Sequence, residues 1–278
     1  MHAHHTSHSA RHETLGATSA ASNGVWLTAS ATVHVKGAWE SVGGATSFAY
    51  ESLTFVFSGA TTNNFNQVDI GITVGAETYV IVPDITTDPR AAGDAGTTLT
   101  LPIHVPAGSQ LAARLRSSSS SGILNVLIIG SSSGLMGTPG VSRAVKLFTD
   151  STSSSAGISI DIGSTVVNTK MTDYTTLIAS SPERVCGIFG IPDSAGDATK
   201  TAIRWLLDLA IGSSGSELDI VTNMMFGADS VSDTPTPKSF GPFLFDVSSG
   251  TRFSARAQNN TGISGDRVIG ISLYGLVP

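Results

Sequence analysis

Apolar and polar residues alternate along much of this chain with a period of two, which is the period of a β-strand that buries one face. Residues 52–57 place Leu or Phe at every second position. Residues 68–74 do the same with Val and Ile. We therefore predict a strand in each of these two segments.

The same alternation recurs in the second half of the chain, where residues 203–211 place Ile, Trp or Leu at every second position. A helix is the alternative for residues 202–209, because this segment contains good helix formers. We favour a strand, because the first half of the chain offers no matching helical pattern.

Two motifs occur once in each half of the chain, in the same order. Residues 69–72 read Asp-Ile-Gly-Ile and match residues 208–211, Asp-Leu-Ala-Ile, with the same apolar face. Residues 105–114, Val-Pro-Ala-Gly-Ser-Gln-Leu-Ala-Ala-Arg, match residues 247–256, Val-Ser-Ser-Gly-Thr-Arg-Phe-Ser-Ala-Arg. The glycine of the second motif is expected to take the left-handed conformation of a turn. Two copies of roughly 110 residues are domain-sized, so we predict a tandem duplication of one domain.

Short predicted strands, separated by turn signals about every ten residues, indicate an all-β protein. The fold class that we predict is two tandem antiparallel β-sandwich domains, jelly-roll-like and related by internal duplication. The predicted boundaries are a flexible N-terminal arm at 1–23, unit one at 24–130, a Ser/Gly-rich linker with a short bridging strand at 131–156, and unit two at 157–278.

Composition and charge narrow the classes of function. Charged residues make up only 13% of the chain and the net charge is −6, without a dense Lys/Arg cluster. Nucleic-acid binding draws most of its affinity from neutralising phosphates, so we predict no nucleic-acid partner. No apolar run reaches the about 18 residues of a transmembrane helix, and we see no signal peptide. The single cysteine, Cys186, excludes an intrachain disulfide and is expected to be a small buried hydrophobe.

Residues 130–134 read Gly-Ser-Ser-Ser-Gly and satisfy the G-x-S-x-G pattern of a nucleophile elbow. That motif needs a helix after the serine and a histidine later in the chain. Residues 135–140 read Leu-Met-Gly-Thr-Pro-Gly, a poor helix, and the last histidine is His104. We therefore predict no catalytic serine and no enzymatic activity.

Histidines gather at the N-terminus, and imidazoles can bind transition metals. Their positions are His2, His4, His5, His8 and His12. Because a metal site needs fixed geometry, we interpret this segment as a flexible arm. His34 and His104 fall in strand patterns and are expected to be ordinary strand residues.

Acidic residues also form no convincing site. Asp84, Asp88 and Asp94 share one predicted loop, but their spacing is not that of an EF-hand. The corresponding part of unit two offers only Asp229 and Asp233. We therefore predict no metal site and no cofactor.

Some acidic residues recur in both units: Asp69 matches Asp208 and Glu77 matches Glu217. Recurrence favours a requirement of the fold over an acidic pair for glycoside hydrolysis.

Arg114 and Arg256 are the most distinctive polar residues of the repeat. Each could form a structural ion pair or hydrogen bonds to loop carbonyls. Alternatively, each could contact a partner subunit, because arginine suits interfaces. Both interpretations remain open at this point.

The run from Asp69 to Glu77, followed by residues 101–114, resembles structural proteins of tailed bacteriophages. The second segment reads Leu-Pro-Ile-His-Val-Pro-Ala-Gly-Ser-Gln-Leu-Ala-Ala-Arg. Unit two departs from this pattern where Leu244 and Ser248 replace the two prolines. The resemblance implies a virion component, such as a head decoration, head-fibre, neck or tail accessory protein, and implies no catalytic residues.

These observations lead us to predict a non-enzymatic structural component of a tailed-phage virion, assembled in the host cytoplasm. It would act through contacts with other capsid, neck or tail proteins, as a homo-oligomer with a trimer favoured. One alternative is an adhesin module that binds a host-surface glycan or receptor. Another is a hydrolase of surface polysaccharide. The 6% aromatic content, with Trp26, Trp39 and Trp205, does not by itself signal a glycan-binding surface.

Overall fold

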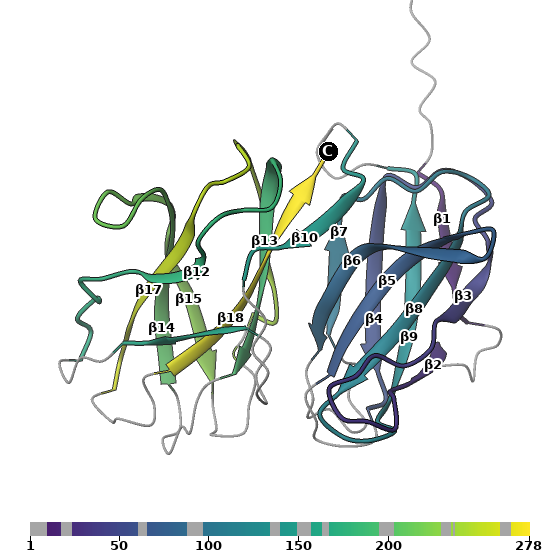
Figure 1. Ribbon diagram of the computed structural model, residues 1–278, viewed down its shortest axis with the longest axis horizontal. Coiled ribbons are helices and arrows are strands. Elements are labelled where there is room, and N and C mark those ends of the chain that lie inside the picture. Colours follow the sequence, from purple (N-terminus) through teal and green to yellow (C-terminus); the bar gives the residue numbers. More distant parts are fainter. Residues whose placement is uncertain are drawn as a thin grey trace, which may run out of the picture.

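The computed structural model of the chain describes strands that form four antiparallel sheets, and Figure 1 shows two sandwiches lying side by side. No helix occurs among the residues that it describes. The predicted all-β fold class is therefore confirmed. The described residues are 10–17, 24–60, 66–87, 97–133, 140–148, 157–162, 167–194, 203–228, 235, 237–261 and 268–278.

Unit one is built from nine described strands. They are β1 (His12–Leu15), β2 (Val25–Thr28), β3 (Glu40–Ala45), β4 (Ser52–Ser58), β5 (Asn66–Val74), β6 (Glu77–Thr87), β7 (Thr98–Leu101), β8 (Gln110–Ser117) and β9 (Ile123–Ser131). The first sheet, called the β9 sheet, has the order β1-β9-β4-β7, and β2 also pairs with β9. The second, called the β5 sheet, has the order β3-β8-β5-β6.

Unit two is also built from nine described strands. They are β10 (Arg143–Lys146), β11 (Ile158–Asp161), β12 (Thr175–Ile178), β13 (Val185–Ser194), β14 (Ile203–Ile211), β15 (Leu218–Ala228), β16 (Phe240–Val247), β17 (Phe253–Asn259) and β18 (Val268–Val277). The β18 sheet has the order β10-β18-β13-β16, with β11 also on β18, and the β14 sheet has the order β12-β17-β14-β15.

The two units share one topology, because each strand of unit one corresponds to the strand numbered nine higher in unit two. In each unit a five-stranded sheet packs on a four-stranded sheet, and this strand order is that of a jelly roll. The register agrees as well: both β5–β6 and β14–β15 shift register at two equivalent points. The turn glycines Gly108 and Gly250 adopt φ values of 80° and 84°, as the repeated turn motif predicts. The duplication is therefore visible in backbone geometry as well as in sequence.

Strand β14 decides the local alternative between helix and strand for residues 202–209. Trp205, Leu207 and Leu209 are fully buried on one face, while Arg204 is exposed on the other. The helix alternative is wrong for the described residues 203–209, because the period of two matches a sheet with one buried face.

The first strand of each unit lies where the sequence predicts an arm or a linker. Strand β1 pairs with β9, and Glu13 of β1 accepts hydrogen bonds from Tyr50 Oη (2.5 Å) and the Ser47 backbone N–H (2.9 Å). Residues 12–15 therefore belong to the β9 sheet. Strand β10 pairs with β18 and belongs to unit two. The rest of the predicted arm and linker, 1–9, 18–23, 134–139 and 149–156, lies outside the described residues.

Each sandwich has an apolar core between its sheets. In unit one, Leu53, Phe55 and Phe57 of β4 are at most 1% exposed, and burying such a side chain contributes about 1.5–3 kcal/mol. The core of unit one is continuous with Phe189 and Tyr274, which belong to unit two. The two units are thus joined by packed side chains.

Candidate functional site

Each unit buries an equivalent carboxylate on the outer face of a sheet. In unit one this carboxylate is Asp69 on β5, whose side chain is 0% exposed. Arg114 lies directly opposite on β8, and its Nε and Nη2 atoms lie 2.8 Å from Asp69 Oδ2. Lys36 donates from Nζ to both carboxylate oxygens, at 2.8 and 2.7 Å. Two cations therefore compensate the buried charge.

Unit two repeats this arrangement. Asp208 on β14 lies opposite Arg256 on β17, whose Nε donates to Oδ2 over 3.0 Å. Lys170 donates to both oxygens of Asp208, at 2.6 and 2.7 Å. The structure thus places both arginines of the sequence motif in ion pairs with the aspartates of the other repeated motif.

An aromatic ring covers each arginine. The guanidinium of Arg114 lies 4.4 Å from the ring centroid of Trp39, and that of Arg256 lies 4.5 Å from the ring of Tyr174. Both rings immediately precede equivalent strands, β3 and β12. A stacked ring limits the motion of the guanidinium and adds a cation–π attraction. In both units, the arginine is therefore positioned by the buried carboxylate and by the stacked aromatic ring.

A β-bulge supplies a further donor to each carboxylate. The backbone N–H of Asp84 on β6 donates to Asp69 Oδ1 over 2.8 Å, and that of Asn223 on β15 donates to Asp208 Oδ1 over 2.8 Å. Asp84 and Asn223 adopt φ values of 47° and 53°, which Asp and Asn tolerate better than most residues. The buried carboxylate thus fixes the shape of the neighbouring edge strand.

Two titratable groups of the unit two cluster, Asp208 and Tyr174, have shifted pKa values. Burial alone would raise the pKa of Asp208, but hydrogen bonds from Lys170, the Asn223 N–H and Arg256 outweigh it and hold the pKa below its ordinary value of 3.8. Burial and a hydrogen bond to Asp219 raise the pKa of Tyr174 to about 12. A general acid or base works best with a pKa near the working pH. Neither residue meets that condition.

The contact between the units is the other polar cluster that the fold builds. Tyr274 of β18 donates from Oη to the Asp84 backbone oxygen over 2.5 Å, and Lys146 of β10 pairs with the Asp84 carboxylate at 2.8 Å. The hydroxyls of Thr86 and Ser272 lie 3.3 Å apart. Around these bonds, the ring of Phe189 stacks on Tyr274 with centroids 4.7 Å apart. The outer face of the β18 sheet thereby covers β6, an edge strand of unit one.

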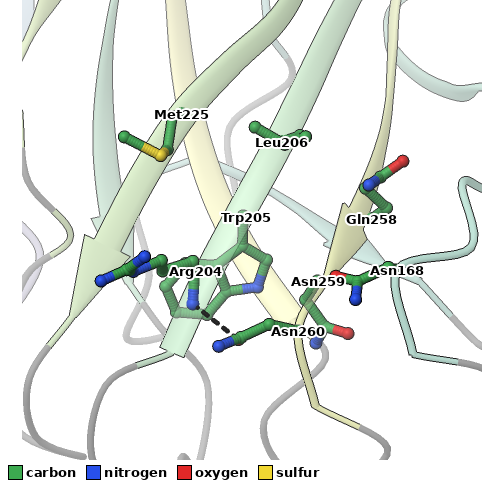
Figure 2. A pocket seen from close by; sticks show the side chains of 8 residues that line it. All are labelled: Asn168, Arg204, Trp205, Leu206, Met225, Gln258, Asn259 and Asn260. Carbon is green, nitrogen blue, oxygen red and sulfur yellow. Dashed lines mark hydrogen bonds between the residues drawn. The ribbon is translucent and has the colours of Figure 1, made fainter.

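A shallow pocket of about 250 Å³ lies at the end of the β14 sheet. Figure 2 shows Asn168 and Gln258 on one side of the Trp205 indole and Arg204 on the other. The Arg204 backbone N–H donates to Asn260 Oδ1 over 2.9 Å. Among the described residues, the buried Nε1 of Trp205 has no hydrogen-bond acceptor. The pocket is therefore lined mainly by neutral polar side chains, with Arg204 at its edge.

The serines of the Gly-Ser-Ser-Ser-Gly motif have structural contacts. The Ser132 hydroxyl accepts a hydrogen bond from the Arg11 backbone N–H (2.9 Å), and the hydroxyls of Ser131 and Ser133 lie 2.7 Å apart. Gly130 lies directly against the Tyr50 ring. Gly134 is outside the described residues.

The remaining candidates divide into described and undescribed residues. The prediction that His34 and His104 are strand residues is wrong: His34 lies in a turn with φ 60°, and His104 lies between β7 and β8, where it faces Glu51 at 3.3 Å. The Cys186 thiol is half-buried and donates to the Leu276 carbonyl. Glu217 pairs with Arg252 at 2.8 Å. Within the described part of the chain, no group of three His, Cys, Asp or Glu residues could hold a metal ion. His2, His4, His5, His8, Asp88, Asp94, Asp229 and Asp233 lie outside the described residues.

Several residues of these clusters have no clear signal in the sequence. Lys36 and Lys170 lie outside the aligned motifs, in segments that precede the third strand of each unit. Lys146 lies in the predicted linker. Asp84 and Asn223 can be recognised as equivalent bulge residues only once the pairing of their strands is known.

Neither a family model nor a curated protein sequence matches the chain. Solved structures to which the chain shows a low similarity include a capsid protein and a tandem carbohydrate-binding module. The major capsid protein P2 from bacteriophage PM2 has 10% sequence identity and a TM-score of 0.31, covering 91% of this chain and 98% of that one. The CBM22-1–CBM22-2 tandem domain from Paenibacillus barcinonensis Xyn10C has 9% identity and a TM-score of 0.25, covering 96% and 91%. In the described residues, no helix has the length and apolar character needed to cross a membrane.

Proposed function

We propose that the protein is a non-enzymatic structural component of a virion, of the tailed-bacteriophage type that the sequence resemblance implies. It would assemble in the host cytoplasm as a homo-oligomer, with a trimer as the first expectation, and contact other virion proteins. The observation that carries this proposal is the contact between the units. There a jelly-roll sheet uses its outer face, through Phe189 and Tyr274, to cover the edge strand of another jelly roll.

The charged clusters support the same function. Asp69 and Asp208 direct their hydrogen-bonding capacity to lysine, arginine and backbone partners within the fold. Such clusters hold sheets and edge strands in fixed shapes, which suits a protein whose surfaces must fit neighbouring subunits.

Immunogold electron microscopy tests the proposal. An antibody against the full chain is applied to particles purified from bacteria that produce the protein. Labelling at a regular position on the particles is the expected result. Label confined to the particle-free supernatant would contradict a structural role in the virion.

A second candidate function is binding of a host-surface glycan, and the pocket around Trp205 favours it. The amides of Asn168 and Gln258 offer the neutral donors and acceptors that sugar hydroxyls use. A glycan array with the wild-type chain and the variants Asn168→Ala and Gln258→Ala tests it. Binding that both variants reduce would support this function, whereas binding that only Trp26→Ala removes would place the glycan on the exposed face of β2.

A further inference from the structure

The contact between unit one and unit two uses two surfaces, and each of them exists twice in the chain. One surface is the edge strand β6, whose equivalent in unit two is β15. The other is the outer face of the β18 sheet, whose equivalent in unit one is the outer face of the β9 sheet. Only one copy of each surface takes part in the contact within the chain.

The β15 copy of the first surface is exposed. The residue equivalent to Thr86 is Met225, since Thr86 pairs with Gln67 and Met225 pairs with Leu206 at matching register positions. Thr86 is 2% exposed, whereas Met225 is 61% exposed. Asp84 is likewise buried, whereas its equivalent Asn223 is exposed. The edge of unit two thus presents, uncovered, the positions that unit one buries against its neighbour.

The β9 copy of the second surface is accessible as well. Gly130 and Gly275 occupy equivalent positions, because Gly130 pairs with Leu53 and Gly275 with Ile188. Ile129 is then the equivalent of Tyr274, and Leu127 of Ser272. Both unit two residues are 0% exposed, whereas Leu127 and Ile129 are only half-buried. The outer face of the β9 sheet therefore carries aliphatic side chains where the β18 sheet carries its contact residues.

The hydroxyl pair of the contact within the chain changes in a matched way. It joins Thr86 to Ser272, and the equivalent positions hold Met225 and Leu127, which are both apolar. An apolar pair therefore replaces the polar pair, so that no polar side chain would face an apolar one at these positions.

The ion pair of the contact within the chain changes in the same manner. It joins Asp84 to Lys146. Because Lys146 pairs with Tyr274 and Thr14 pairs with Ile129, the residue equivalent to Lys146 is Thr14. The equivalent positions thus hold Asn223 and Thr14, which are uncharged and can hydrogen-bond to each other. At these two positions, no buried charge would be left without a partner if the contact were repeated.

We propose that β15 of one copy docks on the outer face of the β9 sheet of a second copy, in the geometry that β6 and the β18 sheet adopt within one chain. The occupant of the exposed edge is thus unit one of another molecule of the same protein. Such a head-to-tail contact closes into a ring or extends as a chain, depending on its rotation. This inference deepens the proposed structural role. Because it is tested on the purified chain, its failure is distinguishable from a failure to label virions.

Sedimentation equilibrium of the full chain, over a dilution series, measures the contact. We expect a concentration-dependent oligomer, and Met225→Asp and Leu127→Asp should each raise its dissociation constant about tenfold or more. Leu218→Asp is the matched control. Leu218 is 65% exposed on the same strand, and its equivalent Tyr79 remains 61% exposed in unit one. Wild-type chain that stays monomeric throughout, or equal weakening by the control, would overturn the proposal. Circular dichroism confirms that each variant is folded.

A charge-pair restoration tests the geometry. Asn223→Asp and Thr14→Lys recreate the two ends of the Asp84–Lys146 pair. Each alone should weaken association, and the double variant should recover most of the loss. Additive weakening in the double variant would show that the two positions do not meet.

Cross-linking gives an independent readout. Met225→Cys and Leu127→Cys, each in a Cys186→Ala background, are mixed and oxidised, and a covalent dimer between the two variants is expected. Thr86→Cys with Ser272→Cys is the positive control within one chain, because those hydroxyls lie 3.3 Å apart. Leu218→Cys in place of Met225→Cys should give no dimer. Equal yields with both would contradict the proposed register.

Discussion

At the scale of single residues, Asp84 shows how one position can serve two roles. Its backbone N–H completes the Asp69 cluster, and its carboxylate binds Lys36 and Lys146. In unit two Asn223 keeps the first role, and its side chain binds Lys170. The bulge is therefore common to both units, while the extra charge belongs to the unit that meets a lysine from its neighbour.

Asp84→Asn should lower the free energy of unfolding by about 1–3 kcal/mol at neutral pH, because Lys36 and Lys146 each lose a carboxylate partner. Burial alone would raise the pKa of Asp84, but Lys36 and Lys146 hold it below the ordinary 3.8. The carboxylate therefore stabilises the fold above that value, and this contribution disappears as the pH falls through the lowered pKa. Urea unfolding at neutral and acidic pH should show the difference from wild type shrinking in acid.

The control for this prediction is Asp246→Asn. Asp246 pairs with Arg184, but both side chains are at least 60% exposed, so the loss should be much smaller than that of Asp84→Asn. A difference for Asp84→Asn that does not change with pH would show that its carboxylate is not the stabilising group.

Residue by residue, the sequence predicts only part of the clusters. The aspartate and arginine of each unit lie on strands of equal register, so alignment finds them. The lysines approach from segments before the third strand, which the aligned motifs do not reach. Their contribution depends on the path of the chain in space, which periodicity does not report.

At the scale of strands, the period of two predicts the elements well. It identifies β4, β5 and β14 and the face of each that is buried. It does not reveal that β1 and β10 join the sheets, because four-residue strands at a sheet edge carry too little pattern. Tertiary pairing with β9 and β18 decides these elements.

Gly130→Ala tests the packing between β9 and the segment before β4. A methyl group there would lie 2.4 Å from the Tyr50 ring, which is fully buried. We expect a loss of about 1–3 kcal/mol in the free energy of unfolding, measured by thermal or urea denaturation. Gly44→Ala is the control, because nothing lies within 4 Å of its added methyl group. Similar losses in both variants would show that the contact with Tyr50 is not the cause.

At the scale of the whole molecule, the duplication predicts two sandwiches but not how they meet. Nearly every residue of β18 is buried. In sequence, such a strand looks like an ordinary core strand, because the pattern does not distinguish burial within a unit from burial between units. The sequence pattern therefore does not predict that Phe189 and Tyr274 contact unit one.

Tyr274→Ala should uncouple the two units. The variant loses the stack on Phe189 and the hydrogen bond to the Asp84 carbonyl. Differential scanning calorimetry should show one cooperative transition in the wild type and two in the variant. Tyr274→Phe, which keeps the ring, should retain a single transition at a lower temperature. Two transitions already present in the wild type would contradict this coupling.

In unit one, the last strand, β9, pairs with the early strands β1, β2 and β4. The backbone hydrogen bonds of these early strands to β9 can therefore form only after the whole unit has been synthesised. Closing so long a loop is slow, and proteins dominated by such distant pairings fold in about milliseconds to seconds. Until β9 arrives, β1 and β4 present open edges. When nascent chains are crowded, β9 of one molecule can complete the sheet of another, so the yield of correctly folded protein should fall as the refolding concentration rises.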